Sequence, residues 1–337
     1  LLYRITGPQS IERLNPLLQL ISKPHDSAAP VQWRWAEDSD TQLSFVWETA
    51  CEKAWRDRHL QAGVLNRLNN SQVLEDKSNL AYLQLNMTVP VLETFIARCP
   101  DDFRRWADNR WSPEEPGATG AACLHDISDS LDWWAVKAAR GNGGKDVWIT
   151  NRDNYADTFA QLPRQGELVI QKYVDRPLLW KGKKFHLRCY SMIMADLTAL
   201  VYEKCYILTA GKDYQTDTAD ISSHITNLSV NKHIPGYPGQ VPCDLPTEFP
   251  EAFENVCKLW ESVVSAASDF MKEQQNENNF EFYGIDVIVD VDQKCWLIEI
   301  NRLPGLESSN LNKDAEDSFY NEMMLSVLQM VTKPLLS

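Results

Sequence analysis

The stretch FYGIDVIVDVDQKCWLIEIN, residues 282–301, decides the fold class of this 337-residue chain. It contains two apolar segments, 282–291 and 294–301, that flank a short polar break. Such a pattern is typical of a β-hairpin. A two-residue turn at positions 292 and 293 would place Asp286 directly opposite Glu299. The hairpin therefore predicts two acidic side chains that face each other on one sheet.

Two opposed carboxylates in a sheet repel each other unless a cation lies between them, and Mg²⁺ prefers oxygen ligands. Asn301 follows Glu299 by two residues, so its side chain points to the same face of the strand. Asp286, Glu299 and Asn301 are therefore candidate Mg²⁺ ligands. The alternative is a solvated sheet face, and a register slip of one residue would separate the two carboxylates.

Other segments of the chain predict both strands and helices. Apolar residues at helical spacing predict a core-facing helix over residues 250–271. We expect further helices at residues 43–62, 74–86 and 151–162, and strands at 89–95, 167–174, 183–195 and 198–208. No internal repeat is visible. The sequence thus predicts an α+β fold with mostly antiparallel sheets, and its length predicts about two domains or one composite unit.

A basic strand is the second chemical feature. In KGKKFHLRCY, residues 181–190, strand alternation puts Lys184, His186 and Arg188 on one face and Phe185, Leu187 and Cys189 on the other. A row of cationic groups that points one way suits a polyphosphate ligand. The alternative is an exposed basic edge strand, because edge lysines also protect a sheet from aggregation.

A glycine-rich turn is the third feature. RGNGGK, residues 140–145, separates two strand-like segments in a hairpin pattern that spans residues 133–150. Backbone N–H groups of Gly143 and Gly144 could approach phosphate oxygens, with Lys137 as a nearby point charge. The turn is not a Walker P-loop, because the GK[ST] ending and the following helix are missing. An ordinary hairpin turn is the alternative.

Composition excludes several classes of protein. The net charge of −14 and the pI near 4.9 argue against a general nucleic-acid or anionic-membrane binder. No apolar run approaches the roughly 20 residues that span a bilayer. Eight scattered cysteines without zinc-ligand spacing are typical of reduced thiols, so we expect a cytoplasmic protein. Because the chain begins with Leu1 instead of Met, we expect it to be part of a longer polypeptide.

Taken in order, these motifs resemble the tubulin tyrosine ligase-like family of ATP-grasp enzymes, over about residues 74–310. The resemblance is carried by Lys77, Lys137, the glycine turn, VIQKYVDRPLL (169–179), KFHLRCY (184–190), HITNLS (224–229) and the acidic pair Asp286 and Glu299. It implies an ATP-grasp fold in which ATP is clasped between central and C-terminal domains. We therefore expect domains at residues 1–73, 74–176 and 177–337.

The resemblance also implies roles for individual residues. Lys77 and Lys137 would contact the phosphates, residues 171–174 would meet adenine, and Arg188 would be the catalytic residue that stabilises a developing acyl phosphate. Asp286, Glu299 and Asn301 would hold Mg²⁺. The full set implied to bind ATP is Lys77, Lys137, Gly143, Gly144, Gln171, Lys172, Tyr173, Val174, Lys184, His186, Thr226 and Asn227.

The implied activity is an ATP- and Mg²⁺-dependent carboxylate–amine ligase. It would add an amino acid of the tyrosine, glutamate or glycine type to a protein acceptor, with a tubulin tail as one candidate, through an acyl phosphate. One alternative is a nucleotide-binding scaffold within a larger protein that no longer ligates. Another is a ligase for a small peptide or metabolite.

Three departures from the family pattern bear on these alternatives. His186 replaces the usual Asp, Asp146 stands where a second glycine is usual, and Leu208 replaces an Arg that grips the incoming substrate. In addition, a strongly acidic chain is a poor general match for an acidic tubulin tail.

Overall fold

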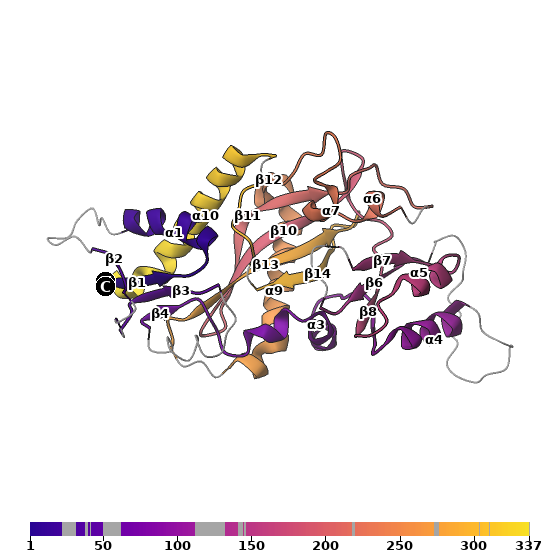
Figure 1. Cartoon of the computed structure of the whole chain (residues 1–337), viewed down its shortest axis with the longest axis horizontal. Helices are drawn as coiled ribbons and strands as arrows, with labels where there is room; N and C mark the ends of the chain where they lie inside the picture. Colours follow the sequence, from indigo (N-terminus) through magenta and orange to yellow (C-terminus); the bar gives the residue numbers. More distant parts are fainter. Residues whose placement is uncertain are drawn as a thin grey trace.

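The computed structural model describes residues 1–21, 32–37, 40, 42–49, 62–111, 132–140, 144, 146–217, 220–272, 276–302, 304–309 and 311–336. The strands in these residues form three sheets that follow one another along the long axis of the molecule (Figure 1). The N-terminal strands lie at one end, the largest sheet lies in the middle, and a smaller sheet lies at the other end.

The central sheet is antiparallel throughout. Its order is β12 (Val241–Asp244), β11 (Ala199–Thr209), β10 (Lys183–Met194), β13 (Phe280–Val289) and β14 (Cys295–Asn301), and β9 (Leu179–Trp180) also pairs with β10. The expected strands at 183–195, 198–208, 282–291 and 294–301 are confirmed within two residues at each end. Alternating apolar side chains fix the register of these strands, because a slip would expose the buried face.

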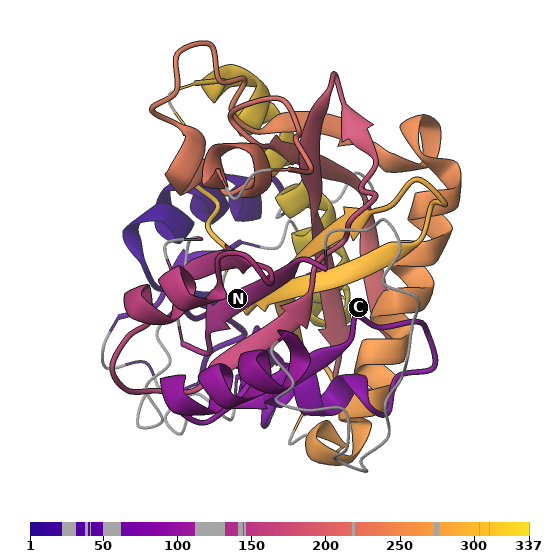
Figure 2. The same ribbon diagram turned by 90° about the vertical axis from the view of Figure 1, so that its right-hand side faces the viewer.

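Helix α9 (Pro250–Met271) covers one face of this sheet (Figure 2). The apolar side of α9 packs against β10, as the helical spacing predicts. The contact joins Val256, Trp260 and Val264 of the helix to Leu187 and Cys189 of the strand. On the other face, Tyr190 and its neighbours pack against α10 (Lys313–Leu336) in a second core. The polar residues that precede Tyr190 on this second face are the ones that line the site described below.

The second sheet has the order β5 (Thr94–Ala97), β8 (Leu168–Lys172), β6 (Trp134–Ala138) and β7 (Val147–Thr150), and it is also antiparallel. Helices α4 (Pro100–Trp111) and α5 (Tyr155–Gln161) pack on it through an aromatic cluster that includes Trp106 and Trp134. The hairpin around the glycine turn is thus confirmed. The expected strand at 89–95 begins only at Thr94, and the expected helix at 151–162 begins only at Tyr155.

The N-terminal sheet departs from expectation. Its strands β2 (Arg34–Trp35), β1 (Leu2–Ile5), β3 (Phe45–Trp47) and β4 (Val64–Leu65) are all parallel, so mostly antiparallel pairing holds only for the two larger sheets. The helix expected over 43–62 is wrong at Phe45–Trp47, and residues 50–61 lie outside the described residues. Three consecutive buried residues carry no period that separates a strand from a helix. Helix α1 (Pro8–Ile21) packs beside α10.

Helix α3 (Lys77–Gln84) confirms the helix expected over 74–86 and follows a short 3₁₀ turn, η1 (Ser71–Leu74). Asp76 caps it by accepting hydrogen bonds from the backbone N–H groups of Ser78 and Asn79. Three further short helices are α6 (Ile221–His224), α7 (Leu228–Asn231) and α8 (Leu245–Glu248). None of the helices within the described ranges is both long and apolar enough to cross a membrane. The six cysteines in these ranges are free thiols.

Candidate functional site

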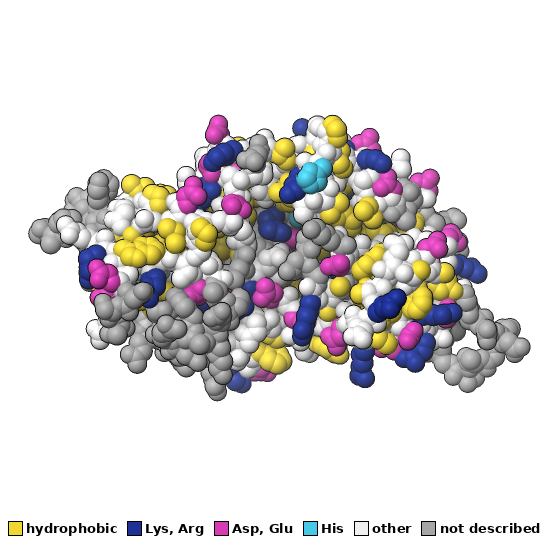
Figure 3. Space-filling model, viewed as in Figure 1, with side chains coloured by type: hydrophobic (Ala, Val, Ile, Leu, Met, Phe, Trp, Pro, Cys, Tyr) yellow, Lys and Arg dark blue, Asp and Glu magenta, His cyan; other side chains and the backbone are white. Residues whose placement is uncertain are grey.

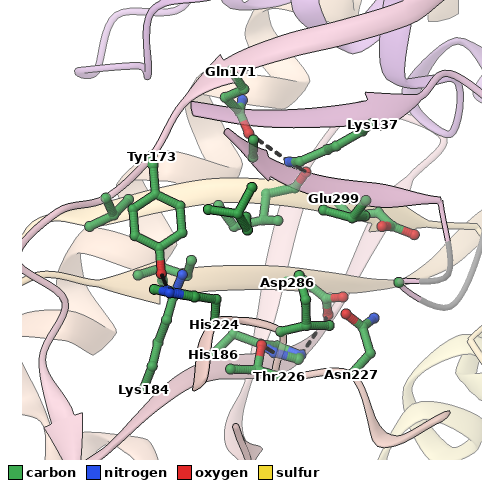
Figure 4. Close-up of a pocket in the computed structure, with 18 of the residues that line it drawn as sticks. Lys137, Gln171, Tyr173, Lys184, His186, His224, Thr226, Asn227, Asp286 and Glu299 are labelled. Carbon is green, nitrogen blue, oxygen red and sulfur yellow. Dashed lines mark hydrogen bonds and ion pairs between the residues drawn. The ribbon is translucent and has the colours of Figure 1, made fainter. Parts of the chain in front are cut away.

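A pocket with an empty volume of about 720 Å³ opens between the central sheet and the β6–β8 sheet. The loop that joins α6 to α7 closes one side of it (Figure 4). Most of the predicted ATP and Mg²⁺ residues line this pocket: Lys137, Gly144, Gln171, Lys172, Tyr173, Val174, Lys184, His186, Thr226, Asn227, Asp286 and Glu299. Lys77 lies in a small adjoining cavity with Lys137 and Gln171. Gly143 lies outside the described residues.

The acidic pair sits on adjacent strands, β13 and β14, where Asp286 is the direct pairing partner of Glu299. The predicted pairing is therefore confirmed, but the predicted two-residue turn is wrong. Val289 pairs with Cys295, and the N–H of Gln293, with φ of 61°, donates to the carbonyl of Asp290 in a longer loop. A bulge between Leu297 and Glu299 then restores the register. The longer loop shifts the pairing by one residue, and the bulge shifts it back, so Asp286 still pairs with Glu299.

Arg188 and Asp286 are pairing partners on β10 and β13 and form a bidentate ion pair. The Arg188 Nε donates to Oδ1 of Asp286, and Nη2 donates to Oδ2 at 3.0 Å. Burial alone would raise the pKa of Asp286, but the guanidinium outweighs it and lowers the pKa. Asp286 is therefore an ionised carboxylate at neutral pH. Arg188 is not itself a lining residue of the pocket, but it contacts the lining residue Asp286 from the face of β10 that the strand alternation predicts.

Glu299 is the less stable anion of the two. Burial and the neighbouring charge of Asp286 raise its pKa. Its Oε2 lies 3.7 Å from Nζ of Lys77, which the Asp76 cap places in the first turn of α3. Lys77 thus reaches the acidic pair from a third element. Asn301, on the same face, has a buried Nδ2 with no hydrogen-bond partner among the described residues.

Lys137 enters the pocket from β6. Its Nζ donates to Oε1 of Gln171 at 2.7 Å and to the carbonyl of Ile298 at 3.5 Å. Burial lowers its pKa to about 8. Gln171, which was expected to meet adenine through its backbone, therefore also positions this lysine through its side chain.

Lys184 is 3% exposed, and its Nζ lies 3.7 Å from the centroid of the Tyr173 ring. Within the described part of the chain its ammonium makes no ion pair or hydrogen bond, and burial holds its pKa well below the usual value. The Tyr173 hydroxyl is 2.8 Å from Nδ1 of His224, whose ring also approaches Trp133 and Tyr214. His224, Trp133 and Tyr214 are not among the site residues predicted from the sequence. His224 heads the HITNLS motif, but no motif marks Trp133 or Tyr214.

His186 lies between the loop and the acidic pair (Figure 4). Its Nδ1 is 2.6 Å from the Thr226 hydroxyl, and its Nε2 is 3.6 Å from Oδ1 of Asp286. Burial lowers its pKa to about 4, so the ring is neutral at pH 7. Gly144 has φ of +73°, and an added Cβ there would lie 2.6 Å from Oδ1 of Asn227. Gly144 therefore lies directly against the Thr226–Asn227 loop.

The charges of the pocket are unbalanced. Four cationic side chains, Lys77, Lys137, Lys184 and Arg188, surround two carboxylates in a chain whose net charge is −14. Figure 3 shows Lys and Arg atoms in a hollow at the middle of one face, while charges of both signs are interspersed elsewhere on that face. Lys77 and Arg188 pair with the two carboxylates, whereas Lys137 and Lys184 make no ion pair within the described residues. Because a buried cation without a counter-charge is costly, an anionic ligand would stabilise this arrangement. The geometry suits a polyphosphate held against an acidic pair.

The comparisons with known proteins agree with this geometry. A family model described as "Tubulin-tyrosine ligase family" matches residues 103–241 and 245–336. The human protein monoglycylase TTLL8 is 29% identical over 55% of this chain and 24% of its own length. The probable tubulin polyglutamylase ttll-9 of Caenorhabditis elegans is 28% identical over 52% and 47%, and the probable tubulin–tyrosine ligase PBY1 of Saccharomyces cerevisiae is 25% identical over 59% and 29%.

These alignments cover between about a quarter and a half of the relatives' own lengths. The family model, by contrast, covers well over half of the present chain. The chain therefore belongs to the tubulin-tyrosine ligase family.

Proposed function

We propose that this chain is an ATP-dependent ligase that joins an amino acid to a carboxylate of a protein acceptor. ATP would lie in the pocket between the two antiparallel sheets, with its base near Tyr173 and Val174 and its phosphates near Lys137 and Lys184. The observation that carries the proposal is a pair of buried lysines, Lys137 and Lys184, that make no ion pair within the described residues and line the same pocket as Asp286 and Glu299.

The donor set fits a divalent cation that arrives with a nucleotide. No three His, Cys, Asp or Glu side chains in the described part of the chain converge closely enough to hold a metal ion alone. Mg²⁺ in nucleotide sites is commonly held by one or two carboxylates together with substrate phosphates. Asp286, Glu299 and Asn301 would hold it here. When bound, Mg²⁺ would neutralise charge on the phosphates.

The chain's own residues would then favour the reaction in two ways. An acceptor carboxylate attacks the γ-phosphoryl group of ATP and gives an acyl phosphate and ADP, and the amine of an amino acid displaces inorganic phosphate to form the amide. Lys137 and Lys184 would stabilise the negative charge of the transferred group. Arg188, fixed by Asp286, would hold the developing acyl phosphate in position.

The relatives favour a protein acceptor over a small molecule. Their names specify monoglycylase, polyglutamylase and tyrosine ligase activities, and two of the three name tubulin. Glycine, glutamate and tyrosine are therefore the amino acids to try first, with tubulin as the first acceptor. Transfer of a labelled amino acid to a small peptide but not to protein would favour the metabolite ligase instead.

Binding is tested first by thermal unfolding with Mg·ATP, for the native chain and for Glu299→Gln. A ligand that binds only the folded state at 100 times its Kd stabilises it by about 2.7 kcal/mol, which raises the Tm by several degrees. We expect this rise in the native chain and its loss in Glu299→Gln. Glu261→Gln, at an exposed position on α9, is the matched control and should behave like the native chain. A folded protein that shows no rise at millimolar Mg·ATP contradicts the proposal.

A second candidate is a nucleotide-binding scaffold without ligase activity. Leu208, at the position where the family pattern has an Arg, is 4% exposed and packs in the α10 core, so it offers no charge to a substrate. Both oxygens of Asp286 are already engaged by Arg188. Nucleotide binding without amino-acid-stimulated ATP hydrolysis would favour the scaffold.

A further inference from the structure

His186 presents an unused nitrogen to the acidic pair. Its side chain is 5% exposed, and Nε2 has no hydrogen-bond partner among the described residues. Oδ1 of Asp286 lies 3.6 Å from Nε2, beyond hydrogen-bond distance. Figure 4 shows the ring between Thr226 and Asp286. A buried polar atom without a partner is costly, so this position calls for an explanation.

The other ring nitrogen, Nδ1, lies 2.6 Å from Oγ1 of Thr226, and the tautomer of the ring decides which of the two donates. In the tautomer whose Nδ1–H donates to the hydroxyl, Nε2 carries a lone pair that points toward the Asp286 carboxylate. Two electron-rich atoms then face each other. A cation between them removes that repulsion. A histidine whose second nitrogen donates to a neighbouring group is the usual arrangement of a metal-bound imidazole.

We propose that Nε2 of His186 is a ligand of the divalent cation, together with Asp286 and the phosphate oxygens of the nucleotide, and that the site therefore prefers Mn²⁺ over Mg²⁺. This inference rests on the proposed nucleotide site, because the cation needs phosphate oxygens to complete its coordination. Imidazole suits transition metals, whereas Mg²⁺ is held almost entirely by oxygen ligands. A carboxylate at position 186 would remove the preference.

The competing explanation is a neutral core histidine that only braces the loop through Thr226. Such a residue would still hold the loop in place, but it would not touch the cation. The two explanations differ in the coordination sphere of the bound ion, which can be observed without any measurement of activity.

The experiment uses Mn²⁺ as the probe. The protein is loaded with Mn²⁺ and ADP, and electron spin echo envelope modulation detects nitrogen bound to the ion. We expect ¹⁴N modulation in the native protein, its replacement by ¹⁵N modulation in protein labelled with ¹⁵N-histidine, and its loss in His186→Asp. Labelling separates histidine from the nitrogens of ADP. The surface variant His233→Asp makes the same chemical change at an exposed position and should keep the modulation.

Competition between Mn²⁺ and Mg²⁺, followed by the signal of free Mn²⁺, gives the second measurement. We expect the ratio of the two affinities to fall at least about tenfold in His186→Asp, in line with the usual effect of altering a metal's surroundings. Nucleotide-dependent Mn²⁺ binding without histidine nitrogen, and with an unchanged ratio, overturns this inference and leaves the proposed function standing. The absence of any nucleotide-dependent cation binding in folded protein overturns both. If His186→Asp fails to fold, the spectra of the native and labelled proteins still decide.

Discussion

At the scale of single residues, the burial of a protonated lysine in the pocket lowers the stability of the ligand-free protein. Lys137 has a folded-state pKa of about 8 because it is buried, against a usual value near 10.4. Protonated Lys137 therefore costs stability, on the order of 3 kcal/mol at most. The cost is fully present below pH 8 and is relieved as the pH rises from about 8 toward 10.4, because only the folded state then loses the proton.

Lys137→Met should accordingly raise the free energy of unfolding of the ligand-free protein at pH 7, while it abolishes the stabilisation by Mg·ATP. The stability difference between variant and native chain should shrink between pH 8 and pH 10. Urea unfolding across this range measures it. Lys212→Met is the control, because Lys212 is mostly exposed and pairs with Asp220 at the surface. A Lys137→Met protein that is less stable than the native chain at pH 7 contradicts this account.

Sequence reasoning worked well for residues whose chemistry follows from strand alternation. Lys184, His186 and Arg188 share a face because neighbours on a strand alternate, whatever the rest of the fold does. It could not find Trp133 or Tyr214. Both residues pack against His224, which lines the pocket, and these contacts join positions far apart in the chain.

At the scale of elements, the β13–β14 hairpin shows how a correct pairing can follow from an incorrect turn. The prediction assumed a two-residue turn, whereas the chain uses a longer loop with Gln293 at positive φ and a bulge near Ile298. The bulge lies next to Glu299, where it re-aims the acidic side chain. β13 is buried along its whole length, and the single-residue bulge in β14 has no marker in the sequence.

The glycine turn between β6 and β7 gives an element-scale prediction. Gly144 packs against Asn227, so Gly144→Ala would push the turn away from the Thr226–Asn227 loop as well as strain its positive φ. We expect nucleotide affinity to fall at least about tenfold, the equivalent of about 1.4 kcal/mol. Titration with a nucleotide, followed by thermal unfolding, measures the loss.

The matched control is Gly236→Ala. Gly236 has φ of +76°, nearly the same as Gly144, but an added Cβ there would meet no atom within 4 Å. Alanine is strained to a similar degree at both positive φ angles. A difference in nucleotide affinity between the two variants therefore reports the contact with Asn227. Equal affinities in the two variants would show that the turn does not shape the pocket.

At the scale of the whole molecule, a buried polar network joins the segment after β4 to the central sheet. Glu281 of β13 is fully buried and accepts hydrogen bonds from the backbone N–H of Leu68 at 2.8 Å and from Nη1 of Arg67 at 3.1 Å. Nearby, Leu65 N–H donates to Oδ1 of Asn279 at 3.0 Å. Neither residue type nor spacing revealed these contacts, because they join positions more than 200 residues apart. The expected boundary at residue 73 stays a prediction.

This network should behave as a buried ion pair, for which the loss of one partner is worse than the loss of both. Arg67→Met removes the guanidinium that opposes the effect of burial, so the pKa of Glu281 rises further and its carboxyl must either stay charged without that cation or take up a proton. We expect a loss of about 3–5 kcal/mol in the free energy of unfolding. Glu281→Gln should cost less, and the double variant Arg67→Met with Glu281→Met should recover much of the loss, because no buried charge then remains. Urea unfolding of the native chain, Arg67→Met, Glu281→Met and the double variant closes the cycle.

The exposed pair Lys272 and Asp269 is the control, and its removal should change stability by less than about 1 kcal/mol. Hydrogen exchange separates a local from a global effect. If the pair only anchors the N-terminal strands, Arg67→Met will speed exchange in β1 and β3 and leave β10 and β13 protected. Because Glu281 lies at the start of the strand that also carries Asp286, we expect exchange to rise in β13 as well, and with it a weaker response to Mg·ATP. Unchanged protection of β13 would show that the Arg67–Glu281 pair does not couple the N-terminal segment to the pocket.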